Sequence, residues 1–132
     1  MNKIDTTKLQ CPVDYTLQIL SGKWKFSVVW QLAGQKCIRF NELQRHLNGI
    51  STVVLKRTLE ELQDYEIVHR EQYNEVPPRV EYSLTPLGYG LLPVFKAMVD
   101  WATENNPEQF PIKRINEIRN VFKAKNSFRT SK

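Results

Sequence analysis

Hydrophobic side chains recur every three or four residues through the first half of the chain, which is the spacing of amphipathic helices. Glycine-containing turns divide this half into separate segments, because glycine readily ends a helix. The pattern predicts four helices, over residues 12–20, 24–33, 41–47 and 52–65. Asn41 and Ser51 are the predicted N-terminal caps of the third and fourth helices.

The hydrophobic period changes to two after Glu66, which indicates extended strands. Residues 68–73 and 79–84 both alternate in polarity, and the stretch 74–78 between them contains two prolines. Because proline cannot continue a sheet, this stretch predicts the stiff tip of a two-stranded ribbon.

A long helix is predicted to follow the ribbon. Thr85 suits its cap and Pro86 its first turn, and the apolar spacing continues to residue 104, with Pro93 kinking the helix or restraining its first turns. A last helix is expected after Pro111, with one apolar side formed by Ile112, Ile115, Ile118 and Phe122.

The order helix, helix, turn, helix, ribbon, helix describes a winged helix-turn-helix, which is mainly α with a small β-ribbon (α+β). We expect residues 1–10 to be an N-terminal arm, residues 11–104 the winged domain, and residues 105–132 a basic, partly helical extension.

Composition narrows the class of protein. The 132 residues suit one domain, and 41% hydrophobic content supports a buried core. The chain has no apolar run near 18 residues and no apolar signal-peptide region at its start, so we expect a cytoplasmic protein with no membrane span. Two cysteines are too few for a disulfide framework.

The distribution of charge is more informative than the net charge of +5. Residues 105–132 carry seven basic and two acidic side chains, so numerically the tail holds the whole surplus. Residues 36–57 hold five basic side chains against Glu42 alone, a local +4 over the predicted helix-turn-helix. This local charge favours double-stranded DNA as the partner.

The first turns of a recognition helix normally meet base edges. With the leucines of helix 52–65 facing inward, the predicted contacts are Ser51, Thr52, Val53, Lys56 and Arg57. Arg57 suits bidentate binding to guanine and Val53 suits a thymine methyl group, whereas Lys56 and Ser51 suit phosphates. The plainer interpretation is the solvated face of any amphipathic helix.

Four further residues are candidates for the wing and the phosphate backbone. Arg79, beside Pro77, is placed to reach a minor groove or a phosphate, although an exposed hairpin arginine without a DNA role is equally consistent. Arg39 and Arg45 are lesser phosphate candidates.

Other classes of function are less well supported. The two histidines, His46 and His69, show no spacing to a thiol or carboxylate that indicates catalysis or a metal site, so we expect no enzyme activity, no cofactor and no metal. The serious alternative is an architectural or adaptor module that binds protein, or DNA without sequence preference.

The chain resembles the HxlR-type family of bacterial transcriptional regulators, which are relatives of MarR-like winged helices. The matching pieces, in the order and spacing of the family, are CPVDYTLQILSGKW (11–24), IRFNELQRHLNGIS (38–51), LKRTLEEL (55–62) and VPPRVEYSLTPLG (76–88). The resemblance implies a homodimer on a near-palindromic operator. Its dimerisation would involve the first and long C-terminal helices, through Val13, Leu17, Leu91, Phe95, Met98 and Trp101.

Two positions depart from the family. Members usually carry lysine in place of Val53, so one DNA contact is expected to be lost. They usually carry glycine in place of Glu66, at a position that commonly needs a left-handed backbone.

The effector is unknown from the sequence, but some family members sense oxidants or electrophiles at the position of Cys11. Cys11 is expected at the cap of the first helix, where the helix dipole favours a thiolate and Asp14 opposes it; the plainer interpretation is an inert thiol. Cys37 is a weaker candidate.

The extension beyond Asn105 has two interpretations. Its apolar side favours docking on the dimer, which we prefer. The alternative is a mobile basic arm on DNA, formed by Lys113, Arg114, Lys123 and Lys125.

Overall fold

The computed structural model describes residues 11–110 and 120–125. The chain forms α1 (Pro12–Leu20), α2 (Lys25–Ala33), β1 (Ile38–Arg39), α3 (Phe40–His46), α4 (Thr52–Asp64), β2 (Val68–Tyr73), β3 (Arg79–Leu84), α5 (Pro86–Tyr89) and α6 (Leu92–Asn105). A further short helical segment covers residues 120–125. The predicted winged helix-turn-helix class is confirmed.

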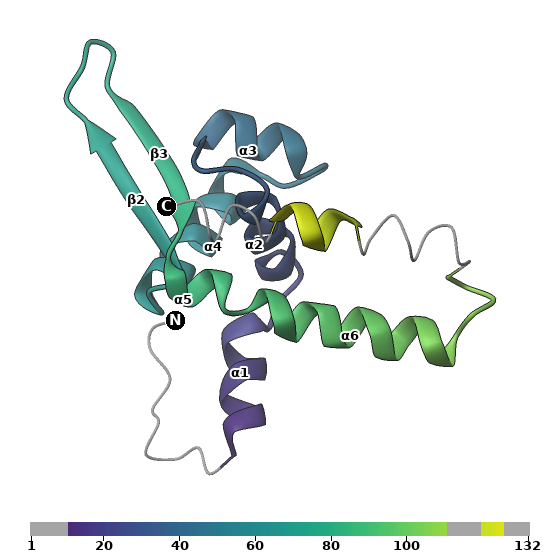
Figure 1. The fold of residues 1–132 in the computed structure, drawn as a ribbon. Coiled ribbons are helices and arrows are strands. Elements are labelled where there is room, and N and C mark those ends of the chain that lie inside the picture. Colours follow the sequence, from purple (N-terminus) through teal and green to yellow (C-terminus); the bar gives the residue numbers. More distant parts are fainter. Residues whose placement is uncertain (1–10, 111–119, 126–132) are drawn as a thin grey trace.

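The sheet is antiparallel, with the strand order β1-β3-β2. β2 and β3 form the predicted ribbon, in a register that pairs Val68 with Leu84 and Tyr73 with Arg79. β1 adds a short third strand, in which Ile38 lies opposite Tyr82. Only the base of the ribbon is buried, and its tip extends from the body as the wing (Figure 1).

The core lies around α2, because Val28, Val29, Leu32 and Ala33 are all buried there. The leucine face of α4 packs into the same core, as the apolar spacing predicted. By contrast, α1 buries only Ile19, and α1 and α6 both project from the body, away from the wing (Figure 1).

Two local predictions are wrong. Asn41 lies inside α3 and does not cap it, because the helix begins at Phe40, directly after β1. The single helix predicted over residues 86–104 is two helices. α5 ends at Tyr89 and is capped by Gly90, whose N–H binds the carbonyl of Pro86, and α6 begins at Leu92 with Pro93 in its first turn. The proline thus restrains the first turn of α6 and does not kink the helix.

The corner after α4 confirms the expectation for Glu66, which adopts a left-handed backbone with a φ of 62°. The Thr85 hydroxyl lies 2.6 Å from the carbonyl oxygen of Glu66 and also accepts the N–H of Gly88 as the cap of α5. One side chain therefore joins the end of the recognition helix to the start of α5.

Replacing Gly88 with alanine is expected to destabilise the fold by about 1–3 kcal/mol, the usual range for overpacking a filled site. A Cβ atom there would lie 2.5 Å from the backbone oxygen of Ile67, which cannot move without breaking the corner. Urea denaturation measures the loss. Gly90→Ala is the matched control, since its closest new contact is 3.1 Å, and an equal loss in both variants would contradict the steric argument.

Replacing Glu66 with glycine is expected to stabilise the chain by about 0.5–1 kcal/mol, because relief of the left-handed penalty exceeds the added chain entropy of glycine. Thermal unfolding measures the gain. Asp64→Gly, at an exposed position in the last turn of α4, is the control and should lower the melting temperature. A melting temperature that falls equally in both variants would contradict this prediction.

Candidate DNA-binding interface

The N-terminal part of α4 presents an exposed face. Ser51, Thr52, Val53, Lys56 and Arg57 are all exposed, and the Val53 side chain is 72% accessible. The structure therefore brings the five predicted recognition residues together on one surface.

The start of α4 is fixed by caps and by the preceding turn. The Ser51 hydroxyl accepts the backbone N–H of Val54 at 3.1 Å, which confirms it as the cap. The side chain of Gln44 in α3 donates to the Ile50 carbonyl and lies within hydrogen-bonding distance of the Thr52 hydroxyl, both at 3.2 Å. Sequence reasoning missed Gln44, since no spacing rule identifies a glutamine that bridges a turn.

The far half of α4 is fastened to α2 by an ion pair. The Lys25 ammonium lies 3.5 Å from a Glu61 carboxylate oxygen, and both side chains are largely buried. Lys25 also lies over the Tyr65 ring, 6.0 Å from its centroid. These contacts orient the recognition helix without using its exposed face. In the sequence, two opposite charges were the only sign of them.

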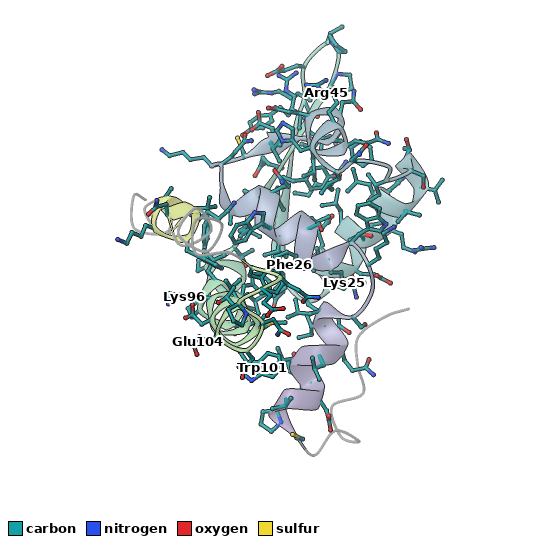
Figure 2. All side chains as sticks on the ribbon, turned by 90° about the vertical axis from the view of Figure 1, so that its right-hand side faces the viewer. Lys25, Phe26, Arg45, Lys96, Trp101 and Glu104 are labelled. Carbon is teal, nitrogen blue, oxygen red and sulfur yellow. The ribbon has the colours of Figure 1, made fainter. Side chains whose placement is uncertain are left out.

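Arg39 and Arg45, the candidate phosphate ligands, are both exposed. Arg45 lies in the last turn of α3, and Figure 2 places it at the opposite end of the molecule from Trp101 of α6. Arg45 and the projecting helix α6 therefore lie on separate surfaces.

In the wing, Arg79 was a candidate for a minor groove or a phosphate, with a hairpin arginine that has no DNA role as the alternative. Its guanidinium contacts Glu75 at 3.0 Å and Glu81 at 3.2 Å and lies 4.0 Å from the centre of the Tyr73 ring. Two carboxylates oppose its charge, which favours a role of Arg79 in shaping the wing over a phosphate contact. Pro77 is exposed at the wing tip, as expected.

The residues assigned to dimerisation fall into two groups. Val13, Leu17, Met98 and Trp101 are exposed apolar side chains on α1 and α6, and Trp101 is 68% accessible. Phe95 is only 2% accessible and packs edge-on against Phe26 of α2, with the ring centroids 4.7 Å apart. The assignment of Phe95 to an intersubunit contact is therefore wrong: it belongs to the core. Leu91 is partly buried against that core.

Both cysteines are free thiols on the surface. Cys11 is the N-cap residue of α1, as expected. Partial burial raises the pKa of the Cys37 thiol, and the hydrogen bond to Glu81 and the negative charge of Glu81 raise it further. A thiol with a raised pKa reacts slowly with oxidants, which makes Cys37 the poorer sensor.

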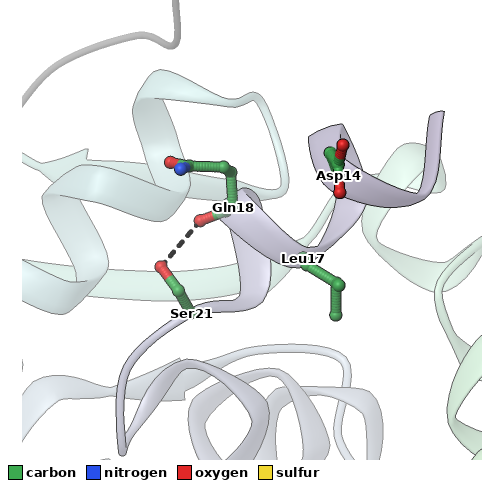
Figure 3. A pocket seen from close by; sticks show the side chains of 4 residues that line it. All are labelled: Asp14, Leu17, Gln18 and Ser21. Carbon is green, nitrogen blue, oxygen red and sulfur yellow. Dashed lines mark hydrogen bonds between the residues drawn. The ribbon is translucent and has the colours of Figure 1, made fainter. Parts of the chain in front are cut away.

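A hollow of about 390 Å³ lies along α1, lined by Asp14, Leu17, Gln18 and Ser21 (Figure 3). The Ser21 hydroxyl donates to the Gln18 carbonyl at 2.9 Å, and no hydrogen bond joins it to the Asp14 carboxylate in this hollow. This lining offers no nucleophile paired with a base. In the described part of the chain, no cluster of histidine, cysteine or acidic side chains is arranged to hold a metal ion.

Comparison with known proteins decides the family. The model of the HxlR-like helix-turn-helix family matches residues 19–110, more than half of the chain. The chain belongs to this family. Its members are transcriptional regulators with a helix-turn-helix, not enzymes. None of the helices described for this chain is long and apolar enough to cross a bilayer.

Individual relatives agree with this assignment. The chain is 41% identical over 98 residues to the regulatory protein MalR of Fusobacterium mortiferum, covering 74% of this chain and 92% of MalR. A MarR-family regulator from Porphyromonas gingivalis W83 superposes with a TM-score of 0.67 at 40% identity, covering 79% of this chain and 99% of that one.

The redox regulator HypR in its oxidised form is also similar to this chain. It superposes with a TM-score of 0.64 at 41% identity, covering 71% of this chain and 96% of HypR.

Proposed function

We propose that this transcriptional regulator binds a specific, near-palindromic operator as a homodimer, with α4 in the major groove. The observation that carries the proposal is the exposed N-terminal face of α4, where Val53 and Arg57 stand clear of the body on a helix held by Gln44 and Lys25. A recognition helix fixed in this way needs little further ordering when it binds base edges, so less conformational entropy is lost on binding.

Each residue of this face has a distinct proposed role. Arg57 binds guanine bidentately and Val53 contacts a thymine methyl group. Lys56 binds phosphate, and the Ser51 hydroxyl, which accepts the Val54 N–H, still has its own proton to donate to a phosphate oxygen. Arg39 and Arg45 extend the phosphate contacts, and Pro77 brings the wing tip against the backbone of the duplex.

The proposed dimer uses the apolar side chains of α1 and α6. Val13, Leu17, Met98 and Trp101 expose more apolar surface than isolated surface residues normally do, and a second copy of this chain would bury it. Because Trp101 of this surface and Arg45 of the helix-turn-helix lie toward opposite ends of the molecule (Figure 2), a symmetric dimer through Trp101 would leave the helix-turn-helix of each copy exposed. Successive major grooves require the two recognition helices to be about 34 Å apart.

The competing function is architectural binding without sequence preference. Selection of bound duplexes from a random pool separates the two, since a regulator enriches one palindromic site and an architectural protein enriches none. Absence of any duplex binding at low salt would overturn both interpretations.

Replacing Arg57 with alanine is expected to weaken binding to the selected operator by about 10- to 100-fold and to relax the preference at one base pair. Lys56→Ala should weaken all duplexes alike and lower the salt slope by about 1, since one phosphate contact is lost. Fluorescence anisotropy at several salt concentrations measures both effects.

Lys23→Ala is the control, because it removes one exposed positive charge between α1 and α2, outside the helix-turn-helix. Equal weakening by Lys23→Ala and Arg57→Ala would contradict base recognition by Arg57. Sedimentation at the same concentrations reports whether the protein is dimeric.

We also propose that Cys11 makes DNA binding responsive to oxidants, an idea supported by its exposed place at the start of α1 and by the similarity to HypR. Diamide takes two electrons from a pair of thiols and joins them as a disulfide. It is expected to change the operator affinity of the parent protein and not that of Cys11→Ser.

Cys37→Ser is the matched variant. A retained response in Cys37→Ser indicates that Cys11 pairs with Cys11 of the second copy, and a lost response indicates that it pairs with Cys37. An unchanged response in Cys11→Ser would overturn the proposal.

A further inference from the structure

Residues 120–125, which lie outside the region matched by the family, dock on α2 (Figure 1). Phe122 is 3% accessible and meets the Trp30 ring edge-on, with the ring centroids 4.9 Å apart. This contact favours the docked interpretation of the extension, within the part of the extension that the structure describes. The predicted contacts of Ile112, Ile115, Ile118, Lys113 and Arg114 lie outside the described residues.

Lys125 anchors the same segment. It is only 6% accessible, its ammonium donates to the Trp30 carbonyl, and it lies 4.3 Å from the centre of the Trp30 ring. The Trp30 carbonyl is among the last four of α2, and the N–H of Gly34 binds the carbonyls of Gln31 and Leu32 instead. Lys125 therefore satisfies an open carbonyl at the C-terminal end of α2. It is thus unsuited to the alternative role in a mobile basic arm.

Burial lowers the pKa of Lys125 from 10.5 to about 8, and no charged group of the described residues adds to this shift. The undocked chain thus binds more protons between these two pH values. Docking is therefore expected to strengthen as the pH rises through this window and to be unaffected by pH below it.

An aromatic row connects the docked segment with α6. Phe122 contacts Trp30, the Trp30 ring stacks on Phe26 at 5.8 Å, and Phe26 meets Phe95 of α6 at 4.7 Å. The same face of α2 thus holds the beginning of α6 and the chain segment that follows it. The rest of α6, with Met98 and Trp101, is exposed.

We propose that residues 120–125 form a strap that fixes the angle of α6 to the winged domain. Phe122 packs against the Trp30 ring, and Trp30 stacks on Phe26, the ring that Phe95 of α6 contacts. The docked segment therefore supports the aromatic contact that holds the beginning of α6. This inference rests on the proposed function in one respect: if α6 forms the dimer, the strap also sets the separation of the two recognition helices and hence operator affinity.

The test measures the angle within one chain. Spin labels are placed at Glu60→Cys on α4 and Glu104→Cys on α6, both exposed positions, in a chain with Cys11 and Cys37 changed to serine. An excess of unlabelled protein ensures that only distances within a chain are recorded. Phe122→Ala and Lys125→Met release the strap, and Lys123→Met, at an exposed position on the same segment, is the matched control.

The distance distribution is expected to broaden in Phe122→Ala and Lys125→Met and to stay narrow in Lys123→Met. Affinity for the selected operator should fall about tenfold or more with the strap released, because a pre-organised arrangement is lost. Hydrogen exchange at residues 120–125 reports release directly, and Lys125→Met keeps the test open if Phe122→Ala does not fold.

A narrow distribution in both release variants would overturn the proposal, and so would unchanged hydrogen exchange, because the two contacts would then not hold the segment. This test is independent of the proposed function. If the protein is monomeric or binds no operator, the proposed function fails, but the distance distribution within one chain still shows whether the strap restricts α6.

Discussion

The packing of α2 is the constraint on which the rest of the molecule depends. Val28, Val29 and Leu32 are almost completely buried, and α2 packs against α3, α4 and the sheet. Apolar burial of this kind contributes about 1.5–3 kcal/mol per large side chain, far more than any surface ion pair. The same helix also carries Lys25 for α4 and Trp30 for the C-terminal strap. One buried helix therefore positions the DNA-binding surface and the projecting helix α6 together.

Electrostatics acts locally in this protein. The net charge of +5 belongs numerically to the tail, yet Lys125 of that tail is buried against α2 and contributes to packing. The wing is a second example of local pairing. Arg79 was a candidate for DNA contact from the sequence, and its guanidinium forms ion pairs with Glu75 and Glu81. Lys56 and Arg57 of the helix-turn-helix remain exposed, and they are the cations that the proposed function assigns to the duplex. The net charge therefore indicated DNA as a reasonable partner, but it did not indicate which part of the chain would bind the DNA.

How far the sequence predicted the structure depended on whether a feature is local. The leucine spacing of α4, the alternation of the ribbon and the Ser51 cap are set by neighbours in the chain, and all three were predicted. The left-handed Glu66 was also foreseen, through the resemblance to a family with glycine there. The break between α5 and α6 was missed because Pro86, Gly90 and Pro93 each allow a helix to continue or to end.

In the candidate site, too, features set by neighbours in the chain were predicted and contacts between distant elements were not. Exposure of the recognition face followed from helix periodicity, because the residues between buried leucines must face outward. The contacts of Gln44, Lys25 and Phe95 join elements distant in sequence, and a hydrophobic pattern does not say which element a side chain will meet. Phe95 is the clearest case: its place on an apolar helix face was consistent with a dimer contact or a core contact, and the ring of Phe26 decided for the core. The apolar surface that remains on α6 is consequently narrower than its sequence indicated and is centred on Met98 and Trp101. In the proposed dimer, a narrow contact at the end of a projecting helix would transmit any change in the angle of α6 to the recognition helices, so the rigidity of α6 would matter more than the area it buries.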